Sequence, residues 1–187
     1  MSRISVRPAR PTEAAVLAEM ANDLNQHVGI RTRPFTPERI LADALGPDRA
    51  VIPLVADIDG VIVGYAFYAI GYNTDVAARS TWLHDLYVAP SARGRGVGRA
   101  LMAAVAAATL RAGATSLEWG VHAANVAALE FYRRLGAGGG DILLMGLGGE
   151  RLRALAATSD ALAAHTDVPI PPAATSDAPR RAAQPPR

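Results

Sequence analysis

The most constraining feature of this sequence is a glycine-rich loop between a predicted strand and a predicted helix. The strand covers residues 82–88, the loop carries glycines at positions 94, 96 and 98, and the helix follows at once and runs to about residue 112. Glycines let a backbone turn tightly and bring several N–H groups near one ligand. Those N–H groups, with the positive end of the helix dipole, are typical of a pyrophosphate site. A glycine-rich turn that holds nothing is the alternative, and the glycines alone do not separate the two.

Two familiar phosphate loops are excluded by spacing. A P-loop has Lys-Ser/Thr after its last glycine, whereas Arg99-Ala100 follow Gly98 here. The dinucleotide fingerprint G-x-G-x-x-G would place its third glycine at Arg99 or Leu101. The loop is therefore neither of these.

The rest of the chain predicts a mixed α+β domain. Before the loop, we expect a strand over 3–8, a helix from about 14 to 24, a helix from Thr36-Pro37 to about 45, and a hairpin of 50–56 and 61–72 around an Asp-Gly turn. After the loop, we expect a strand over 116–121, a helix over 125–135, a last strand over 142–147 and a short helix over 150–157. The domain is predicted to cover residues 1–157, and the Pro/Ala-rich residues 158–187 are predicted to be a disordered tail.

Composition excludes several classes of protein. The chain has no cysteine, so disulfides, thiolate metal sites and a cysteine nucleophile are ruled out, and no metal site is predicted. All 19 cationic residues are arginine, yet the net charge is only +2 and aromatic and basic residues do not interleave, so a nucleic-acid-binding module is disfavoured. No apolar stretch is long enough for a signal peptide or a membrane span, and we expect a cytoplasmic protein without membrane contact.

The loop contains Arg93-x-x-Gly96-x-Gly98, and about 27 residues further on the chain contains Asn125-x-x-Ala128-x-x-Phe131-Tyr132-x-x-x-Gly136-Ala137. These two segments resemble the motifs Q/R-x-x-G-x-G/A and N-x-x-A-x-x-F-Y-x-x-x-G-F/A of the GCN5-related N-acetyltransferase (GNAT) superfamily. Within the superfamily the chain looks most like the diamine (spermidine/spermine) branch, on the segments 64–68, 82–88 and 133–137. The resemblance covers residues 3 to about 157 and implies a mostly antiparallel sheet, flanked by helices, with a splayed central strand pair.

The resemblance implies acetyl-coenzyme A as co-substrate and assigns its contacts. Residues of the strand would line the pantetheine arm through their backbone, with the Val88 N–H facing the thioester carbonyl. Loop residues would hold the pyrophosphate, with Arg93 or Arg99 adding charge. The coenzyme-binding residues expected on this basis are Leu86, Tyr87, Val88, Arg93, Gly94, Arg95, Gly96, Val97, Gly98, Arg99 and Asn125. Asn125 can equally be the N-cap of its helix.

The resemblance also assigns the acid, whereas the base stays open. Tyr132 stands where the family has the general acid that protonates the departing thiolate, although an aromatic core residue is the alternative. The diamine branch has a glutamate where this chain has His84, which is therefore either the general base or a structural strand residue. Asp85 and Glu118 are the other candidate acceptors or substrate contacts, and strict alternation would put Asp85 on the face opposite His84.

The expected activity is acetyl transfer to a primary amine by direct attack in a ternary complex. The acceptor is expected to be a small amine: a polyamine, a diamine or a lysine-like amino acid. A protein lysine, an N-terminal amine and a non-catalytic acetyl-coenzyme A sensor are the alternatives. A homodimer is an option because dimers are common in the family.

Overall fold

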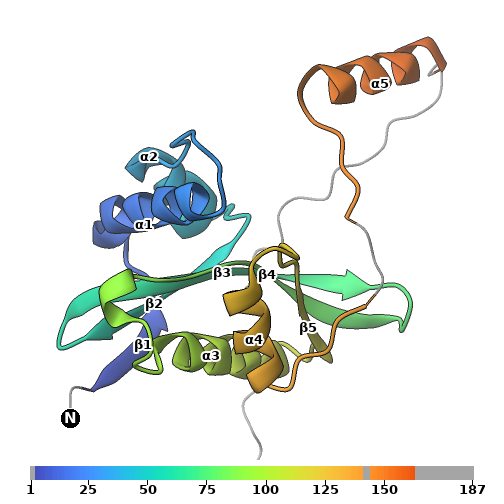
Figure 1. Cartoon of the computed structure of the whole chain (residues 1–187). Coiled ribbons are helices and arrows are strands. Elements are labelled where there is room, and N and C mark those ends of the chain that lie inside the picture. The colour runs from blue at the N-terminus through green and yellow to red at the C-terminus, as the bar shows by residue number, and fades with distance from the viewer. Residues whose placement is uncertain (1–2, 141–143, 163–187) are drawn as a thin grey trace, which may run out of the picture. The chain divides into compact units, whose positions relative to one another are not determined.

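The computed structural model describes residues 3–140 and 144–162, which belong to two compact units that divide after Asn125. The first unit contains a five-stranded sheet (Figure 1). Its strands, in spatial order, are β1 (Ile4–Pro8), β2 (Ile52–Ile58), β3 (Val61–Asn73), β4 (Ala78–Val88) and β5 (Ser116–Trp119). The first four are antiparallel to their neighbours, and β5 is parallel to β4. This confirms the predicted mixed, mostly antiparallel sheet.

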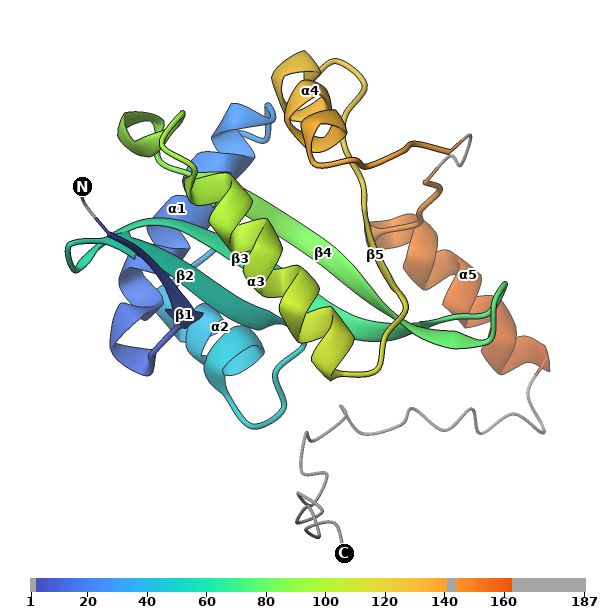
Figure 2. The same cartoon turned by 90° about the horizontal axis from the view of Figure 1, so that it is seen from below.

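Helices cover both faces of the sheet (Figures 1 and 2). One face carries α1 (Ala14–His27) and α2 (Pro37–Ile40), and the other carries α3 (Val97–Arg111). Short helical turns precede or follow them: η1 (Pro11–Glu13), η2 (Leu41–Leu45) and η3 (Pro90–Ala92). Under α1 and α2, the core includes Leu17, Ala21, Ile40, Val55, Tyr65, Phe67 and Tyr87.

Local sequence signals account for several boundaries. Thr36 Oγ1 accepts a hydrogen bond from Arg39 N–H at 3.3 Å, and Pro37 takes the first helical position, which confirms the predicted start of α2. Asp59 and Gly60 both have positive φ, 53° and 84°, as a two-residue hairpin turn requires. Strand β4 starts at Ala78, four residues before its predicted start at 82, and β5 ends at Trp119 rather than at 121.

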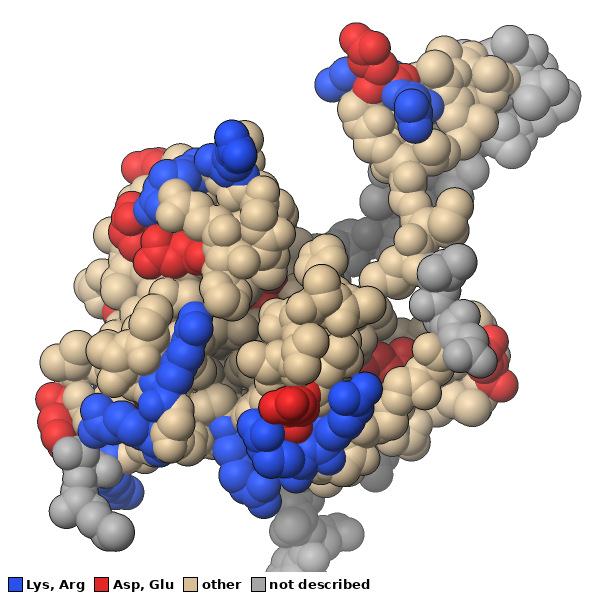
Figure 3. Space-filling model, viewed as in Figure 1, with Lys and Arg blue, Asp and Glu red and all other residues tan. Residues whose placement is uncertain are grey.

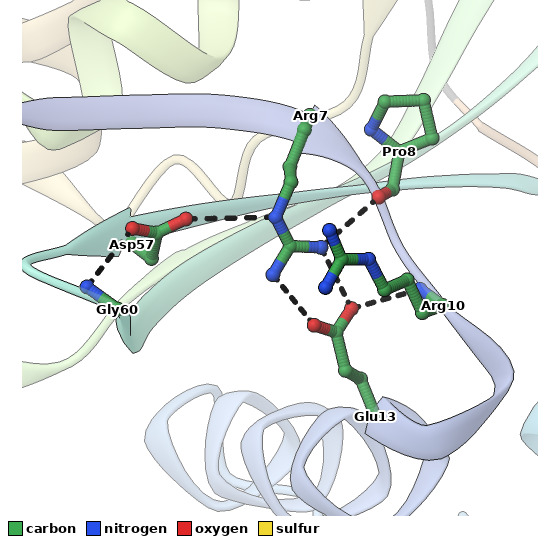
Figure 4. Close-up of polar contacts among 6 residues, drawn as sticks. All are labelled: Arg7, Pro8, Arg10, Glu13, Asp57 and Gly60. Atoms are coloured by element: carbon green, nitrogen blue, oxygen red, sulfur yellow. Dashed lines mark hydrogen bonds and ion pairs between the residues drawn. The ribbon is translucent and has the colours of Figure 1, made fainter.

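An ion-pair network joins the first strand to the first helical turn (Figure 4). Arg7 makes two hydrogen bonds to the Glu13 carboxylate, at 2.6 and 3.0 Å, and its Nε lies 3.6 Å from Asp57 Oδ2. Arg10 N–H donates to Glu13 Oε2 at 2.8 Å, so this carboxylate also caps η1. The hydrogen bond from Arg7 is the main reason why the pKa of Glu13 is below its ordinary value. The network fixes β1 against β2 at the point where the chain enters α1.

The second unit contains α4 (Val126–Arg134) and α5 (Gly149–Leu162). The predicted strand over 142–147 does not form at residues 144–147, where Leu144 and Met145 are 73% and 90% exposed; residues 142 and 143 lie outside the described chain. A strand needs a neighbour to take its hydrogen bonds, and none pairs with this segment among the described residues. Helix α5 continues to Leu162 rather than ending at 157, and the rest of the predicted tail, 163–187, lies outside the described residues. Within the part of the chain that is described, no helix is long and apolar enough to cross a membrane.

Candidate active site

Strand β4 has one edge that is only partly paired. Its pairing with β5 covers Ser80–Leu83, although β4 continues to Val88. On the opposite edge the ladder with β3 continues, and Ala89 N–H donates to the Val63 carbonyl at 2.9 Å. Hydrogen-bonded and non-hydrogen-bonded pairs alternate in an antiparallel ladder, so Val88 and its partner Gly64 form a non-hydrogen-bonded pair.

The backbone N–H and C=O of Val88 therefore point away from β3, toward the side on which β5 has already ended. Leu86 has the same parity, and its N–H and C=O point the same way. No strand of the described chain pairs with this stretch of edge. The central strand pair is thus splayed, as expected, and leaves backbone donors and acceptors for a ligand (Figure 2).

The glycine loop connects this edge to α3. Gly94 and Gly96 have φ angles of 73° and 87°, in the left-handed region that side chains other than glycine rarely adopt. A Cβ on Gly96 would have only one heavy atom within 4 Å, Ile4 Cδ1 at 3.9 Å, so there is room for a side chain. Glycine is needed at this position because of its positive φ, not because of a lack of space. Val97 is buried, and only its backbone can serve a ligand. The first helical bond runs from Ala100 N–H to Gly96 C=O, so the N–H groups of residues 97–99 have no partner within the helix and suit an anion.

The three arginines of the loop differ in what they contact. Arg93 Nε donates to the Val88 carbonyl at 3.0 Å, so its side chain turns back onto the strand. Burial raises the pKa of Tyr87 and the charge of Asp23 adds to this effect, while the Arg93 charge opposes it. Arg95 and Arg99 are exposed. Figure 3 shows basic side chains over the part of the chain between β4 and α3.

Gly64 allows β3, β4 and α3 to approach one another beside this edge. A Cβ at this position would lie 2.6 Å from the Tyr87 carbonyl oxygen and 3.4 Å from side-chain atoms of Leu101 and Val97. Real Cβ atoms essentially never approach a backbone oxygen so closely. The missing side chain therefore determines where the end of β4 and the start of α3 can lie.

His84 is the extra residue of a β-bulge. Phe67 is opposite Asp85 and Tyr68 is opposite Leu83, so His84 has no partner on β3 and is exposed. The expectation that Asp85 and His84 lie on opposite faces rested on strict alternation, which the bulge interrupts. Burial raises the pKa of Asp85, and a positive charge on His84 only partly opposes this effect.

Asp85 is half-buried under α1. Its Oδ2 accepts a hydrogen bond from the Tyr65 hydroxyl at 3.0 Å, and Tyr65 is fully buried. Burial raises the pKa of Asp85, and the hydrogen bond and the charge of His84 only partly oppose this. No cationic nitrogen of the described chain lies within 4.0 Å of the Asp85 carboxylate. A carboxylate whose pKa is raised by burial is a candidate for a functional site.

Glu118, the third candidate acceptor, is held in a structural network. Its Oε1 accepts hydrogen bonds from Ser116 Oγ at 2.7 Å and from Asn73 Nδ2 at 3.1 Å. Asn73 also accepts from Asp75 N–H in the turn between β3 and β4. Glu118 therefore braces that turn against β5, which makes it a weaker candidate for the base.

Tyr132 and Asn125 complete the predicted set. Tyr132 lies in α4 of the second unit, and burial raises its pKa to about 12. Asn125 directly precedes α4, and its own N–H donates to the His122 carbonyl at 2.8 Å. No group of three or more His, Asp or Glu residues that could hold a metal occurs in the described part of the chain.

The profile of the acetyltransferase (GNAT) family matches residues 18–137 of this chain. A thialysine N-epsilon-acetyltransferase of Mus musculus is 28% identical over 146 residues, which cover 73% of this chain and 85% of the relative. An L-ornithine N5-acetyltransferase of Arabidopsis thaliana is 30% identical over 79 residues, which cover 42% of this chain and 35% of that protein. Among solved structures, an aminoglycoside N-acetyltransferase in complex with CoA has the same fold, with a TM-score of 0.63 at 22% identity over 79% of this chain and 96% of that one.

The family profile includes the unpaired edge, the glycine loop and α4, which are the parts of the chain that the two sequence motifs and the geometry single out. The chain therefore belongs to the GNAT family and is an acetyl-coenzyme A-dependent N-acetyltransferase.

Proposed function

We propose that this enzyme transfers the acetyl group of acetyl-coenzyme A to the side-chain amine of a small, lysine-like amino acid, by direct attack in a ternary complex. The observation that carries the proposal is the unpaired edge of β4 at Leu86 and Val88, next to the first turn of α3. The edge offers backbone hydrogen bonds to an extended pantetheine arm, and the helix start offers N–H groups to its pyrophosphate. The residues present thus fit the coenzyme.

The Val88 N–H is the donor for the thioester carbonyl. When the amine nitrogen attacks the carbonyl carbon, a C–N bond forms, the carbonyl oxygen becomes negative, and the C–S bond then breaks to release the thiolate. A preorganised backbone donor at the oxygen stabilises this charge, and such a donor typically contributes on the order of 10²–10³ in rate.

His84 is the base for the incoming amine. An alkylammonium with a pKa near ~10.4 must lose a proton, which costs about 4 to 5 kcal/mol at pH 7. The bulge projects His84 out of the ladder and leaves it exposed, where a substrate or an ordered water can reach the imidazole. Glu118 serves this role less well because its Oε1 is already engaged.

Tyr132 assists the departing sulfur as a hydrogen-bond donor. Its pKa of about 12 keeps the phenol protonated across the physiological range. A thiolate with a pKa near ~8.5, by analogy to cysteine, is a weaker base than such a phenolate, so full proton transfer to the sulfur would be uphill. Donation of a hydrogen bond without loss of the proton stabilises the thiolate and avoids that cost.

The acceptor class follows from the charge near the bulge and from the relatives. The Asp85 carboxylate forms no ion pair within the described chain, and the charge of Asp23, which Arg33 contacts at 3.5 Å, contributes to the raised pKa of Tyr87. Negative charge beside aromatic rings suits an acceptor that carries a second positive group. The names of the mouse and Arabidopsis relatives specify thialysine and ornithine, which are amino acids with a second amine.

A panel of amines tests the proposal. The purified protein is incubated with acetyl-coenzyme A and, in turn, thialysine, ornithine, lysine, spermidine, an aminoglycoside and a lysine-containing peptide, and release of free thiol is followed. We expect the highest kcat/KM for one of the free diamino acids. A preference for the peptide would make the enzyme a protein acetyltransferase. Binding of acetyl-coenzyme A without thiol release for any amine would indicate a sensor.

A further inference from the structure

The side chain of Arg93 contacts the end of β4. Arg93 belongs to the glycine-loop motif, where its charge would be expected to serve the pyrophosphate. Its Nε instead donates to Val88 C=O at 3.0 Å. The turn η3, closed by the hydrogen bonds from Ala92 N–H to Ala89 C=O and from Arg93 N–H to Pro90 C=O, folds the chain so that this side chain can reach back five residues.

The peptide group that joins Val88 to Ala89 is held from both sides. On the β3 side, its N–H donates to the Val63 carbonyl at 2.9 Å. On the open side, its C=O accepts from Arg93 Nε. These two bonds fix the orientation of the last peptide of β4, at the place where β5 no longer supports the strand.

The same bond leaves the Val88 N–H as the free group at the open edge. Both polar groups of Val88 point away from β3, because Val88 and Gly64 form a non-hydrogen-bonded pair. Arg93 occupies the carbonyl with a charge-assisted hydrogen bond, which is stronger than a bond between neutral groups. The guanidinium also places a positive charge close to the N–H that faces the developing oxyanion.

We infer that Arg93 is a positioning residue for acetyl transfer: it holds the end of β4 so that the Val88 N–H is aimed at the thioester carbonyl. This inference rests on the proposed role of the Val88 N–H and adds a side chain through which that role can be tested. A backbone donor cannot be removed by substitution, but the side chain that orients it can be. Misplacement by about 1 Å at a reacting centre can lower a rate on the order of 10²-fold.

Two substitutions separate positioning from charge. Arg93→Gln removes the charge and the guanidinium, whereas Arg93→Lys keeps the charge but lacks the Nε–H that reaches the carbonyl. Arg79→Gln is the matched control, since Arg79 is an exposed arginine of β4, the strand that carries Val88, and lies outside the glycine loop. Because Arg93 is exposed, we expect all three variants to fold, which thermal unfolding checks.

Three readouts are combined: the Kd of coenzyme A without its acetyl group, kcat at saturating acetyl-coenzyme A, and the infrared stretch of the ¹³C-labelled thioester carbonyl in the bound state. In the unmutated enzyme the stretch should lie below its value in solution, because the carbonyl accepts a hydrogen bond. In both Arg93 variants it should return toward the solution value, and kcat should fall by roughly 10- to 100-fold. The Kd of coenzyme A should change little in Arg93→Lys, and Arg79→Gln should match the unmutated enzyme in all three.

Two results would overturn the inference. If Arg93→Lys restores kcat, or if the Arg93 variants raise the Kd of coenzyme A while the carbonyl stretch and kcat stay unchanged, Arg93 acts by charge on the pyrophosphate. If the unmutated enzyme binds and turns over acetyl-coenzyme A without any shift of the stretch, Val88 is not a donor to the carbonyl and there is nothing for Arg93 to position. Absence of turnover in the unmutated enzyme would instead refute the proposed function, and the amine panel detects it separately.

Discussion

Replacement of Gly64 by alanine should destabilise the protein and displace the catalytic edge. The added Cβ would lie 2.6 Å from the Tyr87 carbonyl oxygen, well inside contact distance, and at 3.4 Å from Val97 and Leu101. The neighbours are backbone and buried core, so they cannot move aside cheaply. Overpacking of this kind costs about 1–3 kcal/mol. For a chain of this size that corresponds to a fall in Tm of roughly 2–12 °C, at about 2–4 °C per kcal/mol.

Gly71 provides the control within the same strand. A Cβ at Gly71 would have a single neighbour, Ser80 Oγ at 3.8 Å, which is an ordinary contact. Gly71→Ala should therefore raise stability by about 0.4–1 kcal/mol, because alanine restricts the unfolded chain. Thermal unfolding of the two variants measures both effects, and kcat at a temperature where both are folded measures the displacement of Val88. The reasoning is refuted if Gly64→Ala unfolds at or above the Tm of Gly71→Ala.

Three further predictions concern single side chains. Thr81 is fully buried and, within the described chain, its hydroxyl has no hydrogen-bond partner, so Thr81→Val should raise the free energy of unfolding by about 1 kcal/mol in a denaturant titration. The control is Thr109→Val, which removes the hydrogen bond from Oγ1 to the Val105 carbonyl and should give no gain in the same titration. Because Arg7 lowers the pKa of Glu13, the stability that this pair contributes is present above the ordinary pKa of 4.5 and is lost as pH falls through the lower folded value. Glu13→Gln should therefore lower the free energy of unfolding by about 1–3 kcal/mol at pH 7, and its Tm should decline less steeply than that of the unmutated protein below pH 5. Equal slopes of Tm against pH in the two proteins would count against the pair. His84→Ala should lower the rate by on the order of 10²–10⁴ at pH 7 and by less at pH 9. Tyr132→Phe should lower the rate equally at both pH values, since the Tyr132 pKa of about 12 is outside this range. An unchanged dependence of rate on pH in His84→Ala would make His84 a structural residue.

Local patterns predicted most of the fold because local chemistry determines those features. Two apolar runs around the Asp-Gly turn identify the hairpin of β2 and β3, the Thr36-Pro37 pair identifies the start of α2, and the glycines identify the loop before α3. The segment 142–147 is a continuous apolar run of strand length. A strand forms only where a neighbouring strand accepts its hydrogen bonds, and the sequence pattern does not identify that neighbour.

The parts of the site that were not predicted depend on contacts between segments distant in the sequence. The bulge at His84 follows from the register of β4 against β3, and the bond between Tyr65 and Asp85 joins residues 20 positions apart on neighbouring strands. Asp85 was a candidate from the resemblance, whereas Tyr65 was only part of a matching segment. The contact of the Arg93 side chain with Val88 depends on the turn η3. The Ala89-Pro90 pair indicates a turn, but it does not determine which group the Arg93 side chain contacts.

The central claim is that the glycine loop beside the open edge of β4 binds acetyl-coenzyme A, and calorimetric titration tests it most directly. The compared proteins are the unmutated enzyme, Gly96→Val and Gly113→Val. Both glycines have positive φ, 87° and 70°, and no close neighbours, so both substitutions strain the backbone, but Gly113 follows the far end of α3. The account predicts saturable binding to the unmutated enzyme and to Gly113→Val, and no detectable binding to folded Gly96→Val. Unchanged affinity in folded Gly96→Val, or equal loss in both variants, would contradict it.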